Sequence, residues 1–185
     1  MNLQSTDNLT QQIVEAGCVS WEDLLRSVKN FRYGRNLDRS NWESVWEERK
    51  GTCSSKHAFL VDIARRNGLK NIHLIMGMYK MSAANTPGIA TVLEKYGLTY
   101  ILEAHCYLET PEGMIDCTTV TSSYDRFRAD VLEEIRIEPY QVVEWKVDEH
   151  KSRFSAWVAR EHPTRKVEEL WTIREEIIRA LERER

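Results

Sequence analysis

Cys53 is the side chain in this sequence best placed to act as a nucleophile. It directly follows Gly51-Thr52, and apolar side chains then recur at helical spacing as far as Asn67-Gly68. Threonine is a good helix N-cap, so Cys53 is expected in the first turn of a helix. Unpaired N–H groups and the positive end of the helix dipole favour a thiolate there. The residue is therefore either a nucleophile or a small buried hydrophobic side chain.

His105 and Asp116 follow Cys53 in the order that suits a base and an orienting carboxylate. His105 falls within a predicted strand over 99–109, and Asp116 within a predicted returning strand over 114–120. Aspartate is depleted in β-strands, so its position indicates a polar environment on that face of the hairpin.

The turn between these two strands decides whether the side chains meet. With a four-residue turn over Thr110–Gly113, Glu109 faces Met114, and Asp116 is the diagonal neighbour of His105 on one face. With a shorter loop and a glycine bulge, the pairing shifts by one residue and Asp116 points to the opposite face. The turn residues are compatible with both arrangements, so the sequence leaves them open.

Three short blocks resemble the transglutaminase-like domain of the papain-like cysteine-enzyme superfamily. The blocks are Gly51-Thr52-Cys53, Glu103-Ala104-His105-Cys106-Tyr107 and Asp116-Cys117-Thr118. They occur in the family's order over roughly residues 40–120. The resemblance implies an α+β fold, in which an antiparallel sheet packs against the nucleophile helix and further helices follow at the C-terminus. It also implies Cys53 as nucleophile, His105 as base and Asp116 as the orienting group.

The chemistry that this resemblance implies is acyl transfer through a thioester on Cys53. The thiolate would attack an amide or ester carbonyl of a peptide, a protein or a small amide. His105 would protonate the leaving group and then activate water or an acceptor amine. The backbone N–H of Cys53 would supply one oxyanion donor, and no cofactor is implied. The candidates for the second donor or for substrate contacts are Asn36, Asn41, Trp42 and Tyr107.

Other interpretations of the same residues stay open. The fold could bind a partner without catalysis if Cys53 is simply a buried side chain. Cys53 and His57 are four residues apart on a helix, so with His105 and Asp116 they could hold zinc. The paired-cysteine pattern of structural zinc sites is absent, however. Residues 82–98 read as an insertion that could form a lid over the cleft.

Composition is typical of a globular protein. The 185 residues are 42% hydrophobic and 30% charged, with a formal net charge of −3, so one domain over 1–185 is expected. The sequence shows no basic excess, export signal or apolar run of membrane-spanning length, which predicts a cytoplasmic protein without nucleic-acid or membrane partners. The four cysteines are predicted to be free thiols, with Cys106 facing Cys117 across the hairpin. Oligomeric state is not predicted.

The remaining segments are predicted mostly as helices, with one further strand. Helices are expected at about 9–16, 21–31, 41–46, 89–96 and 128–135, a strand at 71–79, an extended segment at 137–147, and a helical extension over about 150–185 with helices at 151–161 and from 163 onward.

Overall fold

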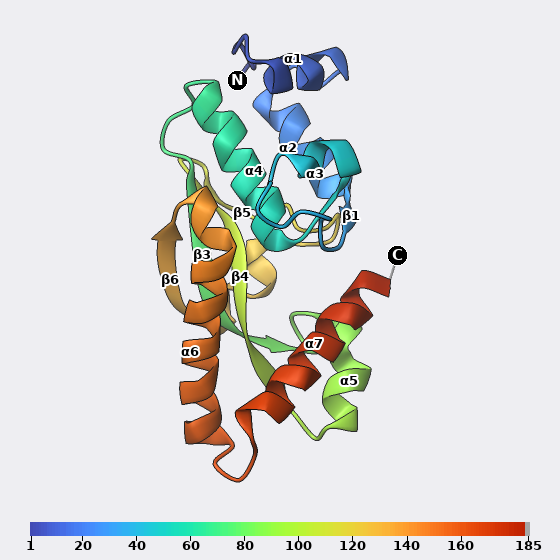
Figure 1. Ribbon diagram of the computed structural model, residues 1–185, viewed down its shortest axis with the longest axis vertical. Coiled ribbons are helices and arrows are strands. Elements are labelled where there is room, and N and C mark those ends of the chain that lie inside the picture. Colours follow the sequence, from blue (N-terminus) through green and yellow to red (C-terminus); the bar gives the residue numbers. More distant parts are fainter. Residues whose placement is uncertain (184–185) are drawn as a thin grey trace.

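A four-stranded antiparallel sheet in the order β5-β4-β3-β6 is the centre of an α+β fold (Figure 1). The computed structural model describes residues 1–183. The sheet strands are β3 (His73–Ser82), β4 (Tyr100–Thr110), β5 (Gly113–Ile115) and β6 (Val131–Ile137), and a separate parallel pair is formed by β1 (Arg32–Tyr33) and β2 (Lys50–Gly51).

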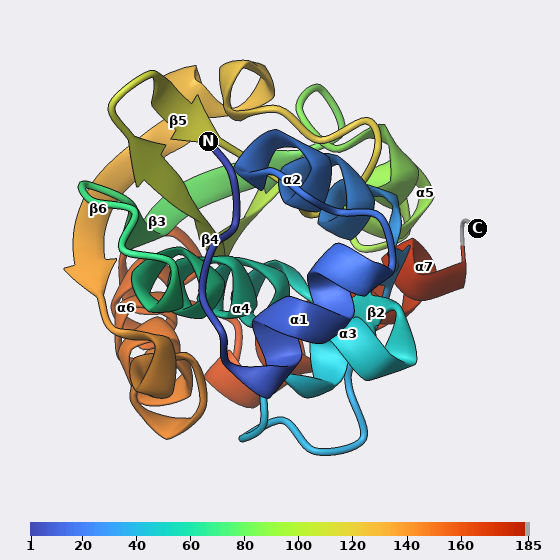
Figure 2. The same ribbon diagram turned by 90° about the horizontal axis from the view of Figure 1, so that it is seen from above.

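Helices cover the sheet, and further helices come before its first strand and after its last strand in the chain. They are α1 (Asn8–Glu15), α2 (Trp21–Asn30), α3 (Ser44–Glu48), α4 (Cys53–Arg66), α5 (Ala90–Lys95), α6 (Glu144–Glu161) and α7 (Val167–Arg183), with short 3₁₀ turns η1 (Pro87–Ile89), η2 (Tyr124–Arg126), η3 (Arg128–Asp130) and η4 (Pro139–Val142). Helices α4 and α6 both contact β4, whereas α7 packs beside α5 and α6 (Figure 1). Helices α2 and α3 pack in turn on α4 (Figure 2). Glu184 and Arg185, the end of the predicted extension, lie outside the described residues.

The helix that carries Cys53 begins where the sequence predicts it. Thr52 is the N-cap: its hydroxyl accepts from the Ser55 N–H, while Ser55 Oγ accepts from the Thr52 N–H. This reciprocal pair satisfies N–H groups that a helix start otherwise leaves without partners. Ser55 Oγ also donates to Asn36 Oδ1 at 2.8 Å, which ties the helix start to the preceding loop.

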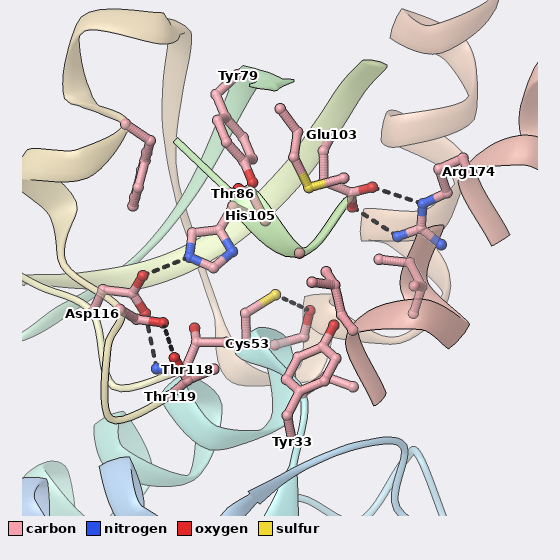
Figure 3. A pocket seen from close by; sticks show the side chains of 18 of the residues that line it. Tyr33, Cys53, Tyr79, Thr86, Glu103, His105, Asp116, Thr118, Thr119 and Arg174 are labelled. Atoms are coloured by element: carbon pink, nitrogen blue, oxygen red, sulfur yellow. Dashed lines mark hydrogen bonds and ion pairs between the residues drawn. The ribbon is translucent and has the colours of Figure 1, made fainter. Parts of the chain in front are cut away.

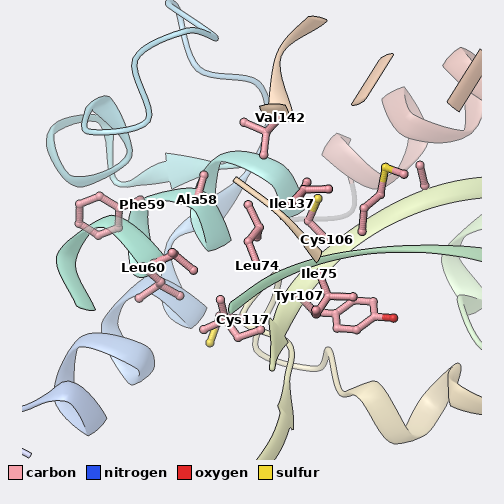
Figure 4. Close-up of a cluster of buried hydrophobic side chains, with 14 of the residues drawn as sticks. Ala58, Phe59, Leu60, Leu74, Ile75, Cys106, Tyr107, Cys117, Ile137 and Val142 are labelled. Carbon is pink, nitrogen blue, oxygen red and sulfur yellow. The ribbon is translucent and has the colours of Figure 1, made fainter. Parts of the chain in front are cut away.

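Buried apolar side chains join α4 to the sheet. Ala58, Leu74, Cys106, Ile137 and Val142 belong to one continuous core and come from the helix, three strands and η4 (Figure 4). This packing holds the first turn of α4 against β4. Within residues 1–183, no helix has both the length and the apolar character required to cross a bilayer.

The hairpin adopts the first of the two arrangements considered for its turn. Glu109 pairs with Met114 and Leu108 with Ile115, which is the register that brings Asp116 toward His105. The predicted strand over 114–120 is too long, however, because β5 ends at Ile115. The chain leaves the ladder there because the Asp116 carboxylate accepts a hydrogen bond from an N–H two residues ahead, a local turn that competes with strand pairing.

Two predictions after the hairpin are wrong. Residues 128–135, predicted as a helix, hold η3 and most of β6, and residues 137–147, predicted as extended, hold η4 and the start of α6. Glu133 and Glu134 favour a helix, but the segment pairs along β3 as an edge strand. Hydrogen bonding to a neighbouring strand outweighs local propensity there.

Gly77 provides a stability test of the sheet. A β-carbon at this position would lie 2.8 Å from Cε1 of the buried Tyr107 ring. Gly77→Ala should therefore lower the free energy of unfolding by about 1–3 kcal/mol, measured by urea denaturation, because the ring must shift. Leu132→Ala on β6, where the side chain is 53% exposed, should change it by less than about 0.5 kcal/mol. Equal effects would show that the ring has room to move.

Candidate active site

One cavity of about 640 Å³ brings the three predicted catalytic side chains together. Cys53 enters it from the start of α4, His105 from β4 and Asp116 from the segment after β5 (Figure 3). The thiol is partly exposed to this space, so a carbonyl group has access to it. The order of the three groups in the cavity is sulfur, imidazole, carboxylate (Figure 3).

Asp116 holds the His105 ring by one nitrogen. Asp116 Oδ2 lies 2.9 Å from His105 Nε2, and the two side chains are 3% and 13% exposed. Burial disfavours the carboxylate, but the charge of His105, its hydrogen bond and that of Thr118 lower the pKa of Asp116 to about 2. Since Nε2 is engaged, Nδ1 is the ring nitrogen left for the thiol, and the free ring nitrogen is turned toward Cys53 (Figure 3).

Cys53 and His105 favour each other's charged forms. A hydrogen bond from Cys106 holds the pKa of Cys53 well below its usual value, against burial, and the positive charges of His105 and Lys146 lower it further. Burial lowers the pKa of His105, but the negative charges of Asp116 and Cys53 raise it to about 10. Both shifts favour a thiolate–imidazolium pair at neutral pH.

Cys106 lies beside Cys53 and does not face Cys117 across the hairpin as predicted. The β4–β5 ladder ends at Leu108, so Cys106 does not face Cys117 across it, although both thiols are free and buried. Burial and the neighbouring Cys53 raise the pKa of Cys106 well above its usual value. Cys106 therefore keeps its proton beside the Cys53 sulfur.

His57 connects the nucleophile helix to the segment that carries Asp116. Its Nδ1–H donates to the Cys53 carbonyl at 2.7 Å, and its Nε2 accepts from the Cys117 N–H at 2.7 Å. Burial lowers the pKa of His57, which matches the neutral tautomer that these two contacts require. Both ring nitrogens are engaged, so His57 is no zinc ligand here. Within residues 1–183, no three His, Cys, Asp or Glu side chains are arranged to hold a metal ion.

The three upstream candidates for the second oxyanion donor are not among the residues that line the cavity. Asn36 is buried and its Nδ2 donates to the Lys50 carbonyl at 2.9 Å. Asn41 is exposed, and its Oδ1 accepts from the Glu43 N–H at 3.1 Å in the turn before α3. Trp42 packs against the core. All three stabilise the loop that precedes Cys53.

Tyr107 is also outside the cavity. Its ring is fully buried and its hydroxyl donates to Glu134 Oε1 at 2.6 Å, so it supports the sheet beneath His105. Tyr33 of β1 and, from the loop that follows it, Arg35 and Arg39 line the cavity instead. Sequence spacing gave no reason to choose these over the asparagines of the same loop.

Helices α6 and α7 form a wall that the sequence analysis missed. Glu103 of β4 forms a bidentate ion pair with Arg174 of α7, with both N–O distances 2.7 Å. Burial disfavours the Glu103 carboxylate, but the charge of Arg174 lowers its pKa to about 2. Arg174 lies one turn from both Leu170 and Ile178 on an otherwise apolar helix face. A charged residue on such a face was the feature of the sequence that could have predicted a buried ion pair in this wall.

The segment over 82–98 forms part of the cavity wall. Residues 85–88, which include the start of η1, line the cavity, and α5 follows η1. Asn85 is buried and held by hydrogen bonds to the Lys80 carbonyl, the Ser82 N–H and the Asp130 carboxylate. The segment is thus anchored at its entry to the cavity, and whether it moves as a lid stays a prediction.

Comparisons with known proteins give no further assignment: no family model matches the chain, and no curated protein or solved structure matches it either.

The charge state of Cys53 can be tested by a pH titration of thiolate ultraviolet absorbance. One thiolate should persist well below the usual cysteine pKa, because the neighbouring Cys106 thiol and the charged imidazole stabilise it. His105→Ala should move this titration up toward an ordinary thiol pKa of about 8.5. Burial raises the pKa of Cys106 and of Cys117, so neither thiol contributes at low pH. A single ordinary titration in both proteins would contradict the ion pair.

The bridging role of His57 predicts a loss of stability on substitution. His57→Phe keeps an aromatic ring but removes the ring's hydrogen bond to the Cys53 carbonyl and leaves the buried Cys117 N–H without its partner. The free energy of unfolding should fall by about 2–3 kcal/mol, measured by chemical denaturation. The control His73→Phe, at the half-buried start of β3, should cost less than about 0.5 kcal/mol. Equal losses would argue against the bridge.

Proposed function

We propose that this chain is a cysteine acyl hydrolase or acyltransferase of the transglutaminase-like, papain-like class. The observation that supports this most directly is the Cys53–His105–Asp116 arrangement at the wall of an accessible cavity. The substrate is an amide or ester of a peptide, a protein or a small molecule, and the product of the first step is a thioester on Cys53. The nucleophile at the start of a helix packed on an antiparallel sheet, with the base and carboxylate following in chain order, supports the fold assignment.

The first half-reaction uses the ion pair directly. The Cys53 thiolate adds to the substrate carbonyl carbon, and the carbonyl oxygen becomes an oxyanion. The imidazolium of His105 gives its Nδ1 proton to the departing amine or alkoxide as the carbon–heteroatom bond breaks. Asp116 keeps the ring oriented through Nε2 during this transfer.

The second half-reaction restores the thiolate. His105, now neutral, takes a proton from water or an acceptor amine as that molecule attacks the thioester carbonyl. The carbon–sulfur bond breaks, and the thiolate leaves beside the re-protonated imidazole. Water gives hydrolysis and an amine gives transfer, so the choice depends on which nucleophile the cavity admits.

The oxyanion has two donors within this geometry. Cys53 is the first residue of α4, so its N–H is among those that have no acceptor within the helix. Tyr33 lines the cavity on the side of the thiol (Figure 3). Burial and the negative charge of Cys53 raise the pKa of Tyr33, which keeps the phenol protonated and able to donate. We assign Tyr33 the role of second donor in place of the upstream candidates.

Acylation by an activated ester such as p-nitrophenyl acetate tests the proposal. A burst of p-nitrophenol should accompany one acetyl group on Cys53, located by mass spectrometry. Cys53→Ala should abolish the burst, His105→Ala should slow acylation about 10²-fold or more, and Tyr33→Phe should slow it about 10²-fold. The buried thiol Cys18, outside the cavity, provides the matched control, because Cys18→Ala should retain the burst. No burst together with an unreactive Cys53 would favour a non-catalytic binding domain.

A further inference from the structure

The cavity carries a positive charge in a protein whose net charge is negative. The chain as a whole has a formal charge of −3. The cationic side chains that line the cavity are Arg35, Arg39, Arg126, Lys146, Lys151 and Arg174, and the acidic ones are Glu103, Asp116 and Glu175. The Cys53–His105 ion pair adds no net charge. Positive charge is thus concentrated around the cavity into which the Cys53 thiol opens.

Each of the three acidic groups has a partner in the protein, but the charge of His105 is shared between Asp116 and the Cys53 thiolate, so six cationic and three acidic side chains leave an excess of three positive charges. Glu103 pairs with Arg174, Glu175 pairs with Arg35 at 2.8 Å, and Asp116 is bonded to His105. The cations Arg39, Arg126, Lys146 and Lys151 have no ion-pair partner among the carboxylates of residues 1–183. The excess charge is therefore available to a ligand.

Lys146 is the cation whose position is the most informative. Its side chain comes from α6, is only 7% exposed, and lines the cavity. Nζ donates to the Ala104 carbonyl at 2.7 Å, one residue before His105 in the chain. An ammonium has three N–H donors and is costly to bury without a counter-charge. Its positive charge lowers the pKa of the Cys53 thiol and of the Glu103 carboxyl, which line the same cavity.

We propose that the acyl group taken by this cavity is anionic and that Lys146 binds its carboxylate. Arg39 and Arg126, which are exposed, line the cavity from the loop before α3 and from η2, and their charges guide an anion toward the thiolate. This inference rests on the proposed acyl transfer at Cys53 and names its substrate class: an amide or ester whose acyl part ends in a carboxylate.

Two alkylating reagents of nearly equal size test the charge preference without requiring turnover. Iodoacetate carries a carboxylate where iodoacetamide carries a neutral amide. With either reagent the Cys53 thiolate displaces iodide and forms the same kind of carbon–sulfur bond. The rate constant for iodoacetate divided by that for iodoacetamide should be higher at Cys53 than at a small free thiol in the same buffer. The preference should fall about tenfold in Lys146→Met and should weaken as salt is added to the wild type.

Two further variants control the experiment. Lys70→Met removes an exposed cation outside the cavity and should leave the ratio unchanged. Lys146→Gln keeps a hydrogen-bond donor for the Ala104 carbonyl and should lose the preference as well, so a folding defect of the methionine variant does not decide the result. With acyl substrates, p-nitrophenyl hemisuccinate should have a higher kcat/KM than its methyl ester, and Lys146→Gln should reverse this order.

The outcomes separate this inference from the proposed function. Fast alkylation of Cys53 with no preference for iodoacetate would overturn the anionic substrate and leave acyl transfer standing. A Lys146 variant that shifts only the pH profile of the iodoacetamide reaction would overturn it too, because Lys146 would then act on the thiolate alone. Slow reaction of Cys53 with both reagents would overturn the proposed function and this inference with it.

Discussion

The hydrogen bond between Asp116 and His105 is the contact on which the rest of the site depends. A charged imidazole with 13% exposure needs a counter-charge, and the Asp116 carboxylate supplies it at 2.9 Å. Asp116 can reach the ring because β5 stops one residue earlier and the chain turns. The register of the hairpin and the turn that follows it together bring the carboxylate to the ring.

The thiol and the carboxylate come from separate elements, and the buried imidazole of His57 links them. Its two hydrogen bonds connect the first turn of α4 with the backbone next to Asp116. The Thr52–Ser55 cap and the contact of Ser55 with Asn36 fix the same helix turn from the other side. The geometry at Cys53 is thereby set by hydrogen bonds that take no part in the chemistry.

The sequence predicted the local features of the fold and failed where tertiary pairing decides the structure. The cap at Thr52 depends on neighbouring residues and was readable, whereas the turn over Thr110–Gly113 fitted two registers and only the strand pairing of the structure distinguishes them. The strand over 131–137 was not, since only its pairing with β3 makes it extended. The same reason explains the missed cavity wall: Lys146 and Arg174 come to Cys53 through helix packing that no local spacing encodes.

The candidate nucleophile and its partners lie on α4, β4 and the turn after β5, while much of the opposite wall comes from α7. Side chains of α7 that face the cavity, such as Ile178 and Leu181, contact none of the hydrogen bonds that orient the imidazole. Substitutions on this single helix can therefore reshape the space for an acyl group while the reactive geometry is retained. Such a division would let selection, or a protein engineer, alter selectivity in small steps, starting from a scaffold that already folds.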